Sequence, residues 1–317
     1  MLIKQIRRGE IVTPNNVFLA PLAGYTDYCF RNPQLNLGIG LSFTELTSAK
    51  GIVFNSRGNA SLLSLGGEDL YDKTAVQLFG SDPYYLRKAC EDSQLEKFKI
   101  VDINMGCPVP KVYKNGEGSA LLKNISLAEE IVKECVKSGK TITIKIRTGQ
   151  KEGDDVAEDF AKMAENSGAK LITIHGRVRD KYYSGPVDFN AIEKAKRAVS
   201  IPVIANGGIF TIKDADEIMD KTGADGVMLA RGAIENPFLV SELLGITPNL
   251  TLKEFILCHL SNMEEAYGEH KSAVWFRKFI PYYFKSKKNF KEIKLKMQAT
   301  EKVEELKKII EDLPDNL

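Results

Sequence analysis

Short runs of β-branched and other apolar residues alternate with stretches of helical spacing from position 17 to about 244. Each run is five or six residues long, which is typical of a buried strand. The stretches between the runs, such as 127–136 and 188–199, repeat their apolar residues every three or four positions. The pattern predicts eight strands, at 17–21, 41–45, 74–79, 100–104, 141–146, 171–175, 202–206 and 226–230.

Regular alternation of strand and helix indicates a parallel sheet, because each crossover between parallel strands needs a helix. Eight such units within about 230 residues favour a closed (β/α)₈ TIM barrel. The alternative is a doubly wound open sheet. No Gly-x-Gly-x-x-Gly motif follows the first predicted strand, which counts against that alternative.

The alternation stops after Pro248, and three helical stretches follow at 252–267, 273–285 and 290–312. Pro281 should end or kink the middle helix. We therefore predict two domains, a TIM barrel at 1–245 and a small all-helical domain at 246–317. A helical unit of that size should depend on the barrel for part of its core.

Charge is unevenly distributed along the 317 residues, although the net charge is only +2. Residues 271–296 contain nine Lys or Arg and a single acid, Glu292, so this segment carries +8 and the rest of the chain carries −6. A basic block on an acidic body indicates a surface that binds a polyanion. The content of 43% hydrophobic and 27% charged residues is that of a globular protein and excludes general disorder.

Targeting and metal-binding signals are missing from the sequence. The first ten residues do not resemble a secretory signal, and no apolar run is long enough to span a membrane. Five scattered cysteines without a Cys-x-x-Cys pair argue against disulfides and zinc. We therefore expect a cytoplasmic protein with no metal and no membrane association, and a monomer.

Chemistry in a TIM barrel gathers at the carboxyl ends of the strands, so polar residues there are candidate site residues. The first strand ends in Pro21-Leu22-Ala23, whose small and apolar residues could accommodate a flat ring or form a plain turn. Gln77 is a polar amide within an apolar run and needs a buried partner or a cavity. Lys145 and Arg147 share one face of their strand, as residues two apart do, and inside the barrel mouth they need an anionic or polar ligand. The alternative is a strand end whose side chains reach to water, which is more credible for Arg147 than for Lys145.

The sixth strand end is ambiguous, whereas the last two strand ends favour a phosphate site over simple turns. His175 ends the sixth strand, where a structural and a functional role are equally credible. Asn206-Gly207-Gly208 and Ala230-Arg231 follow the seventh and eighth strands, the positions at which this fold recurrently binds phosphate. Glycine exposes backbone N–H groups and arginine adds a charged donor.

Cys107 lies between Gly106 and Pro108, just beyond the fourth strand, whereas the other cysteines fall in helical stretches. A thiol with an ordinary pKa of about 8.5 is mostly protonated at neutral pH and can donate a proton or act as a nucleophile. The following segment, 115–121, is interpreted as a flexible loop that ends in a helix cap at Ser119.

These residues and motifs resemble those of the tRNA-dihydrouridine synthases. Asn-Met-Gly-Cys-Pro at 104–108, followed by Gly-Glu-Gly-Ser-Ala-Leu-Leu at 116–122, is the most specific match. Weaker matches follow in the family's order from about residue 18 to 283. They are Ala-Pro-Leu-Ala-Gly-Tyr-Thr-Asp (20–27), Gln-Leu-Phe-Gly (77–80), Lys-Ile-Arg (145–147), His-Gly-Arg (175–177), Asn-Gly-Gly-Ile (206–209) and Ala-Arg-Gly-Ala (230–233).

The resemblance implies a flavin mononucleotide (FMN) in the barrel mouth, reduction of that flavin by NADPH, and reduction of the C5=C6 bond of particular uridines in tRNA. It implies that Cys107 is the general acid and that Asn104 and Arg147 face the uracil. The implied FMN residues are Pro21, Leu22, Ala23, Gln77, Lys145, His175, Asn206, Gly207, Gly208, Ala230 and Arg231. A thiol opposite the flavin would supply the proton that accompanies hydride transfer.

The basic block completes the hypothesis, because its cations could hold tRNA phosphates. The candidates are Arg277, Lys278, Lys285, Lys287 and Lys288. Among the interleaved aromatics we expect Trp275, Phe279 and Tyr283 to be mostly buried, as aromatic residues at helical spacing usually are. Two alternatives are a dihydroorotate-dehydrogenase-like flavin reductase of a free pyrimidine or other small molecule, and an RNA-binding protein without catalysis.

Overall fold

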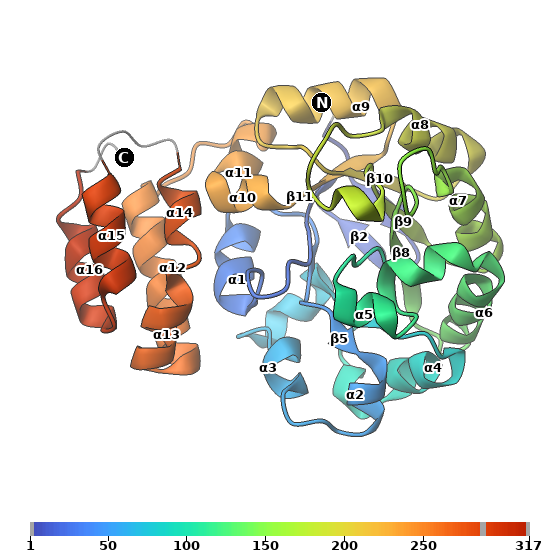
Figure 1. Ribbon diagram of the computed structural model, residues 1–317, viewed down its shortest axis with the longest axis horizontal. Coiled ribbons are helices and arrows are strands. Elements are labelled where there is room, and N and C mark those ends of the chain that lie inside the picture. Colours follow the sequence, from blue (N-terminus) through green and yellow to red (C-terminus); the bar gives the residue numbers. More distant parts are fainter. Residues whose placement is uncertain (1–2, 286–289, 315–317) are drawn as a thin grey trace.

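The computed structural model describes residues 3–285 and 290–314, and the predicted TIM barrel is confirmed (Figure 1). All eight predicted barrel strands form, and every pairing among them is parallel. They are β3 (Val17–Leu19), β4 (Ser42–Phe43) with β5 (Thr47–Ser48), β6 (Thr74–Phe79), β7 (Ile100–Met105), β8 (Thr141–Arg147), β9 (Leu171–His175), β10 (Val203–Asn206) and β11 (Gly226–Leu229).

The barrel closes between its first and second strand positions. Strands follow the order β3-β11-β10-β9-β8-β7-β6-β4, and a parallel bridge from Phe18 to Leu41 joins the two ends. The second position is split, because β4 pairs with the start of β6 at Thr74 and β5 pairs with its end at Leu78. Closure brings all the strand ends to one rim, where the candidate residues lie.

Helices surround the barrel as the pattern predicted. The stretch expected at 127–136 lies within α6 (Ile125–Val136), and α8 (Phe189–Ala198) covers the stretch expected at 188–199 except for its two end residues. The α-helices of the barrel are α1 (Tyr28–Asn36), α2 (Ala49–Val53), α3 (Asn59–Leu63), α4 (Pro83–Glu91), α5 (Pro110–Lys114), α6 (Ile125–Val136), α7 (Ala157–Asn166), α8 (Phe189–Ala198), α9 (Ile212–Thr222), α10 (Arg231–Glu235) and α11 (Leu239–Leu244). Four 3-10 helices add η1 (Glu68–Lys73), η2 (Ser93–Leu95), η3 (Gly118–Lys123) and η4 (Arg179–Lys181).

A small antiparallel hairpin at the N-terminus, β1 (Ile6–Arg8) and β2 (Ile11–Thr13), was not predicted. Its buried side chains Ile6 and Ile11 join the apolar layer inside the barrel, which includes Phe18 and Ile204. The hairpin therefore closes the end of the barrel opposite the strand tips. Its three-residue strands are too short to show a period, and each carries polar residues.

Five helices follow the barrel: α12 (Leu252–Tyr267), α13 (Glu269–Phe276), α14 (Ile280–Tyr283), α15 (Lys291–Ala299) and α16 (Val303–Glu311). They lie to one side of the barrel (Figure 1) and pack on it through α1. Phe30 of α1 stacks on Phe279 at 6.0 Å between ring centroids and meets His259 edge-on. The C-terminal helices thus share one hydrophobic core with the barrel, as their small size led us to expect.

Two of the three predicted C-terminal helices are divided. The helix expected at 273–285 breaks at 277–279, and Pro281 lies in the first turn of α14, where its missing N–H costs nothing. The helix expected at 290–312 breaks at 300–302, where the Arg277 guanidinium donates to the Thr300 carbonyl. Within residues 3–285 and 290–314, none of the helices has the length and apolar character needed to cross a bilayer.

Candidate active site

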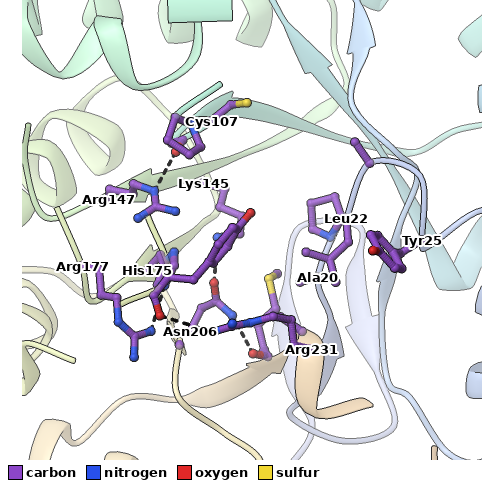
Figure 2. Close-up of a pocket in the computed structure, with 18 of the residues that line it drawn as sticks. Ala20, Leu22, Tyr25, Cys107, Lys145, Arg147, His175, Arg177, Asn206 and Arg231 are labelled. Atoms are coloured by element: carbon purple, nitrogen blue, oxygen red, sulfur yellow. Dashed lines mark hydrogen bonds between the residues drawn. The ribbon is translucent and has the colours of Figure 1, made fainter. Parts of the chain in front are cut away.

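A cavity of about 350 Å³ opens at the carboxyl ends of the barrel strands, a size that suits a cofactor or small molecule (Figure 2). The structure brings together around it every barrel residue that the sequence analysis selected. These are Pro21, Leu22, Ala23, Gln77, Asn104, Cys107, Lys145, Arg147, His175, Asn206, Gly207, Gly208, Ala230 and Arg231. Alternation along the strands explains their convergence, since inward-facing residues lie two apart above the apolar layer.

The two sides of the cavity differ in chemistry. Figure 2 shows Ala20, Leu22 and Tyr25 on one side and Arg147, Arg177 and His175 on the other. The first side comes from β3 and the loop after it, where small side chains such as Ala20 and Ala23 project little into the cavity. A flat, partly apolar ligand with an anionic or polar edge would match both sides.

Positive charge dominates the polar side. Four cations line the cavity, namely Lys145, Arg147, Arg177 and Arg231, and none of the described lining residues is Asp or Glu. Burial and the nearby Arg147 lower the pKa of Lys145 to about 7. Burial and the same cation lower the pKa of His175, so its imidazole is neutral at physiological pH. An anionic ligand would relieve this repulsion, so the charge of the cavity suits an anionic ligand.

Arg147 also organises the loops around the cavity. Its Nε donates to the Gly106 carbonyl at 2.9 Å, and its Nη1 donates to the carbonyls of Val178 and Tyr182 at 3.2 and 2.8 Å. The predicted substrate contact by Arg147 therefore comes with a second role, because this guanidinium ties the Cys107 loop to the loop after β9.

The glycines after β10 pack against His175 and line a recess of the cavity together with it. Gly207 and Gly208 have φ angles of +116° and +72°, which favour glycine. A Cβ on Gly207 would lie 2.8 Å from the His175 ring, and a Cβ on Gly232 would lie 2.1 Å from the Ile209 carbonyl oxygen. The loops after β10 and β11 thus pack closely, and their residues Gly207, Gly208 and Arg231 line the cavity together, which suits a phosphate site.

Cys107 sits on a fixed loop after β7. Its N–H donates to Asn104 Oδ1 at 2.9 Å, and its carbonyl accepts from the Ser119 hydroxyl at 2.8 Å and the Ser119 N–H at 3.0 Å. The interpretation of Ser119 as a helix cap is wrong, because this buried hydroxyl binds the cysteine loop instead. Burial raises the pKa of the Cys107 thiol, so the group stays protonated at neutral pH and suits a proton donor.

Three tyrosines on the cavity wall escaped the sequence analysis. Tyr25 follows β3, Tyr183 follows η4, and Tyr282 comes from α14, far along the chain. Tyr25 meets Tyr282 edge-on at 5.6 Å between centroids, and Arg231 lies 4.9 Å from the Tyr183 ring centroid. Position in the strand-end loops could have indicated Tyr25 and Tyr183. Tyr282 carried no such signal, because only tertiary packing brings α14 to the cavity.

Arg277, Lys278 and Lys285, the three predicted tRNA-binding cations that the structure describes, do not line the cavity and contact other protein groups. Arg277 binds the Thr300 carbonyl and lies 3.5 Å from Glu301, and Lys285 forms an ion pair with Glu235 at 2.8 Å. Half-buried Lys278 lies 5.5 Å from the Tyr25 ring centroid, between barrel and helices. Lys287 and Lys288 lie outside the described residues.

The expectation of three buried aromatics in the basic block is correct for two of them. Phe279 and Tyr283 are buried, whereas Trp275 is 41% exposed. Trp275 faces away from the core on α13, with the Lys271 ammonium 4.1 Å from its ring centroid. Helical spacing alone could not tell which side of this short helix would be covered.

Comparisons with known proteins agree with the motif resemblance. A family model described as Dihydrouridine synthase (Dus) matches residues 18–317. A probable tRNA-dihydrouridine synthase of Rickettsia bellii is 35% identical over 288 residues, which cover 88% of each chain. The tRNA-dihydrouridine synthase B of Vibrio cholerae is 32% identical over 319 residues, which cover 98% of each chain.

Solved structures share the fold at low sequence identity. An old yellow enzyme homologue from Zymomonas mobilis has a TM-score of 0.55 and 15% identity, and the match covers 78% of this chain and 94% of that one. A 2-naphthoyl-CoA reductase has a TM-score of 0.59 and 12% identity, covering 76% of this chain and 52% of that one. At these identities the likeness shows the barrel fold alone.

Proposed function

Because the chain belongs to the dihydrouridine synthase family, we propose that it reduces the C5=C6 bond of particular uridines in tRNA to 5,6-dihydrouridine, with FMN as cofactor and NADPH as reductant. Family membership confirms the resemblance seen in the motifs. The observation that carries the proposal is the position of Cys107, whose pKa is raised by burial, on the rim of a barrel cavity lined by lysine and arginine side chains.

The residues of the cavity fit FMN. Gly207, Gly208 and Arg231 line the same end of the cavity and would hold the phosphate there, and a side chain at Gly207 would collide with His175, which lines the same end. His175, Asn206 and Ala230 complete this end, and Pro21, Leu22 and Ala23 offer a low wall for the ring. Lys145 donates to Asn206 Oδ1 at 2.9 Å with one of its three N–H groups, which leaves donors for the polar edge of a flavin.

A bound, reduced flavin would supply hydride to one carbon of the uracil double bond. The other carbon needs a proton, and the Cys107 thiol would provide it. Burial keeps that thiol protonated. The Cys107 N–H donates to Asn104 Oδ1 and the Cys107 carbonyl accepts from the Ser119 hydroxyl, and these bonds hold the loop in place. Asn104 and Arg147 would bind the uracil edge, since both line the cavity next to Cys107.

The C-terminal helices would hold the tRNA. The proposed division places catalysis in residues 1–245 and tRNA binding in residues 246–317, with Arg277, Lys278, Lys285, Lys287 and Lys288 as phosphate contacts. A uridine stacked within folded tRNA cannot reach the barrel mouth, so the target base must be flipped out into the cavity. Tyr282 links the two parts, because it belongs to α14 and lines the cavity.

Reduction of a free pyrimidine, the small-molecule alternative, is less favoured. It leaves the +8 segment at 271–296 without a role, and the relatives bear names that specify tRNA. RNA binding without catalysis leaves the arrangement of Cys107 and the cavity without a role.

The decisive experiment maps dihydrouridine in tRNA from cells with and without this protein. Positions that lose dihydrouridine on deletion and regain it with purified protein, FMN and NADPH support the proposal. Free uridine and free uracil serve as competing substrates in the same assay. Turnover of the free pyrimidines without any change in tRNA would refute it.

A further inference from the structure

A chain of hydrogen bonds runs beneath the cavity, across β6, β7 and β8, to the Cys107 loop. The Cys107 N–H donates to Asn104 Oδ1 at 2.9 Å, and Asn104 Nδ2 donates to Gln77 Oε1 at 2.8 Å. Gln77 Nε2 donates in turn to Asp102 Oδ2 at 2.7 Å. The other oxygen of Asp102 accepts from the Thr143 hydroxyl at 2.5 Å.

All these bonds point toward Asp102, and the carboxylate dictates that direction. An ionised carboxylate can only accept, so Gln77 must present its NH₂ group to Asp102 and its carbonyl to Asn104. Asn104 must then donate to Gln77 and turn its own carbonyl to the backbone. That carbonyl accepts from two N–H groups, those of Gly106 at 3.1 Å and Cys107.

We propose that Asp102 is a positioning residue whose carboxylate orients the amides of Gln77 and Asn104, so that the cavity floor presents N–H donors and the Cys107 loop is held in place. An amide NH₂ has two donors, and one donor of each amide is engaged within the chain of bonds. Both amides line the cavity. The floor is thereby matched to carbonyl oxygens, the acceptors that the pyrimidine edge of a flavin and a uracil both carry.

Asp102 itself does not line the cavity and is fully buried. Burial raises its pKa to about 6, while Thr143, Gln77 and Lys145 oppose that rise. Burying a carboxylate has a large desolvation free energy, and an apolar residue of similar size would fill the same place without it. Setting the direction of the amides gives the acid a role that an apolar residue could not perform.

The choice of ligands rests on the proposed function, but the hydrogen-bond chain can be tested without it. Asp102→Asn is nearly isosteric and can donate, so it permits the amides of Gln77 and Asn104 to reverse. Thr143→Val is the matched control, because it removes a hydrogen bond from the same carboxylate without allowing reversal. Both variants are compared with the wild type at pH 8, where Asp102 is ionised.

The first readout is amide hydrogen exchange at Gly106 and Cys107 in flavin-free protein. We expect Asp102→Asn to speed exchange by about tenfold, the effect of one lost hydrogen bond, and Thr143→Val to leave it within about twofold. Equal effects of the two variants would overturn the proposal. If Asp102→Asn does not fold, Gln77→Leu cuts the same chain one link further on and must speed exchange at the same two groups, and unchanged exchange refutes the proposal.

The second readout is the binding of FMN and the absorption spectrum of bound flavin. Reversed amides turn acceptors toward the flavin carbonyls, so Asp102→Asn should weaken FMN binding by about tenfold or more and shift the spectrum. Binding and spectrum like those of Thr143→Val would refute the donor floor. A protein that passes both tests yet leaves tRNA unchanged would refute the proposed function and keep Asp102 as a positioning residue.

Discussion

Substitution of Gly207 by alanine tests the recess proposed for the cofactor phosphate. The new Cβ would lie 2.8 Å from His175 Cδ2, 3.0 Å from its Nε2 and 3.2 Å from Arg177 Nη1. The imidazole cannot simply move aside, because it is buried, contacts Arg177 at 3.3 Å and stacks on Tyr183. Backbone strain adds to this clash, since φ at Gly207 is +116°.

The structure offers a matched control at Gly223, the residue that ends α9. Gly223 also has positive φ, +62°, but a Cβ there would have no neighbour within 4 Å. An L-residue at positive φ costs roughly 1–2 kcal/mol, and overpacking a tight site costs a further ~1–3 kcal/mol. We therefore expect a loss of roughly 1–2 kcal/mol for Gly223→Ala and about 2–5 kcal/mol for Gly207→Ala.

Urea unfolding of the flavin-free proteins measures these losses of stability, and titration with FMN measures the affinity of each variant for the cofactor. Gly223→Ala should bind FMN like the wild type. Gly207→Ala should bind at least about tenfold more weakly, because one blocked or displaced hydrogen bond of a charged ligand already costs that much. Equal destabilisation of both variants, or unchanged FMN binding by Gly207→Ala, would refute our assignment of the recess.

Three further predictions concern Cys107, His259 and Lys285. Cys107→Ala should keep bound flavin and lose reduction of tRNA by about 10²–10⁴-fold in single turnover, the range for a general acid, and near-normal rates would remove the proton-donor role. Burial lowers the pKa of His259 from 6.5 to about 3. Below pH 6.5 the His259 side chain therefore binds a proton in the unfolded protein but stays neutral in the folded protein. The free energy of unfolding should fall by up to ~1.4 kcal/mol per pH unit as the pH falls from 6.5 toward 3. In His259→Asn this part of the pH dependence should vanish when the free energy of unfolding is measured by urea titration at several pH values. The same pH dependence in the variant and the wild type would contradict the prediction. Lys285→Ala breaks an exposed ion pair with Glu235 and should cost under about 1 kcal/mol of stability. If Lys285 binds a phosphate, the variant should lower the salt dependence of tRNA binding by about one charge, whereas the same slope would place the RNA elsewhere.

The barrel could be predicted from the sequence because its signals are local. Each strand is an apolar run, and chemistry in this fold lies at strand ends, so the positions of Gln77, Lys145 and Cys107 followed from the pattern alone. The roles of hydrogen-bonded residues were not local. Ser119 looked like a helix cap in sequence, and only folding places its hydroxyl 2.8 Å from the Cys107 carbonyl.

The C-terminal helices were harder to predict, since tertiary contacts decide their ends and faces. No Gly or Pro marks the break at 300–302, which lies where Arg277 reaches the Thr300 carbonyl. The hairpin at Ile6 and Ile11 was missed because its apolar side chains are buried only through contacts with the closed barrel, which local sequence does not show. The exposure of Trp275 likewise depends on which neighbours cover α13.

The contact of α1 with α12 and with Phe279, the residue before α14, has a consequence for engineering of target choice. Phe30 packs against Phe255, His259 and Phe279, and the Tyr267 hydroxyl donates to Asp27, the N-cap of α1. A chimera that received only a relative's C-terminal helices would meet a foreign α1 and a foreign cavity wall at Tyr282. Productive grafts must therefore exchange residues 27–36 together with the C-terminal helices, so that the transferred α1 and the transferred helices keep their native contact.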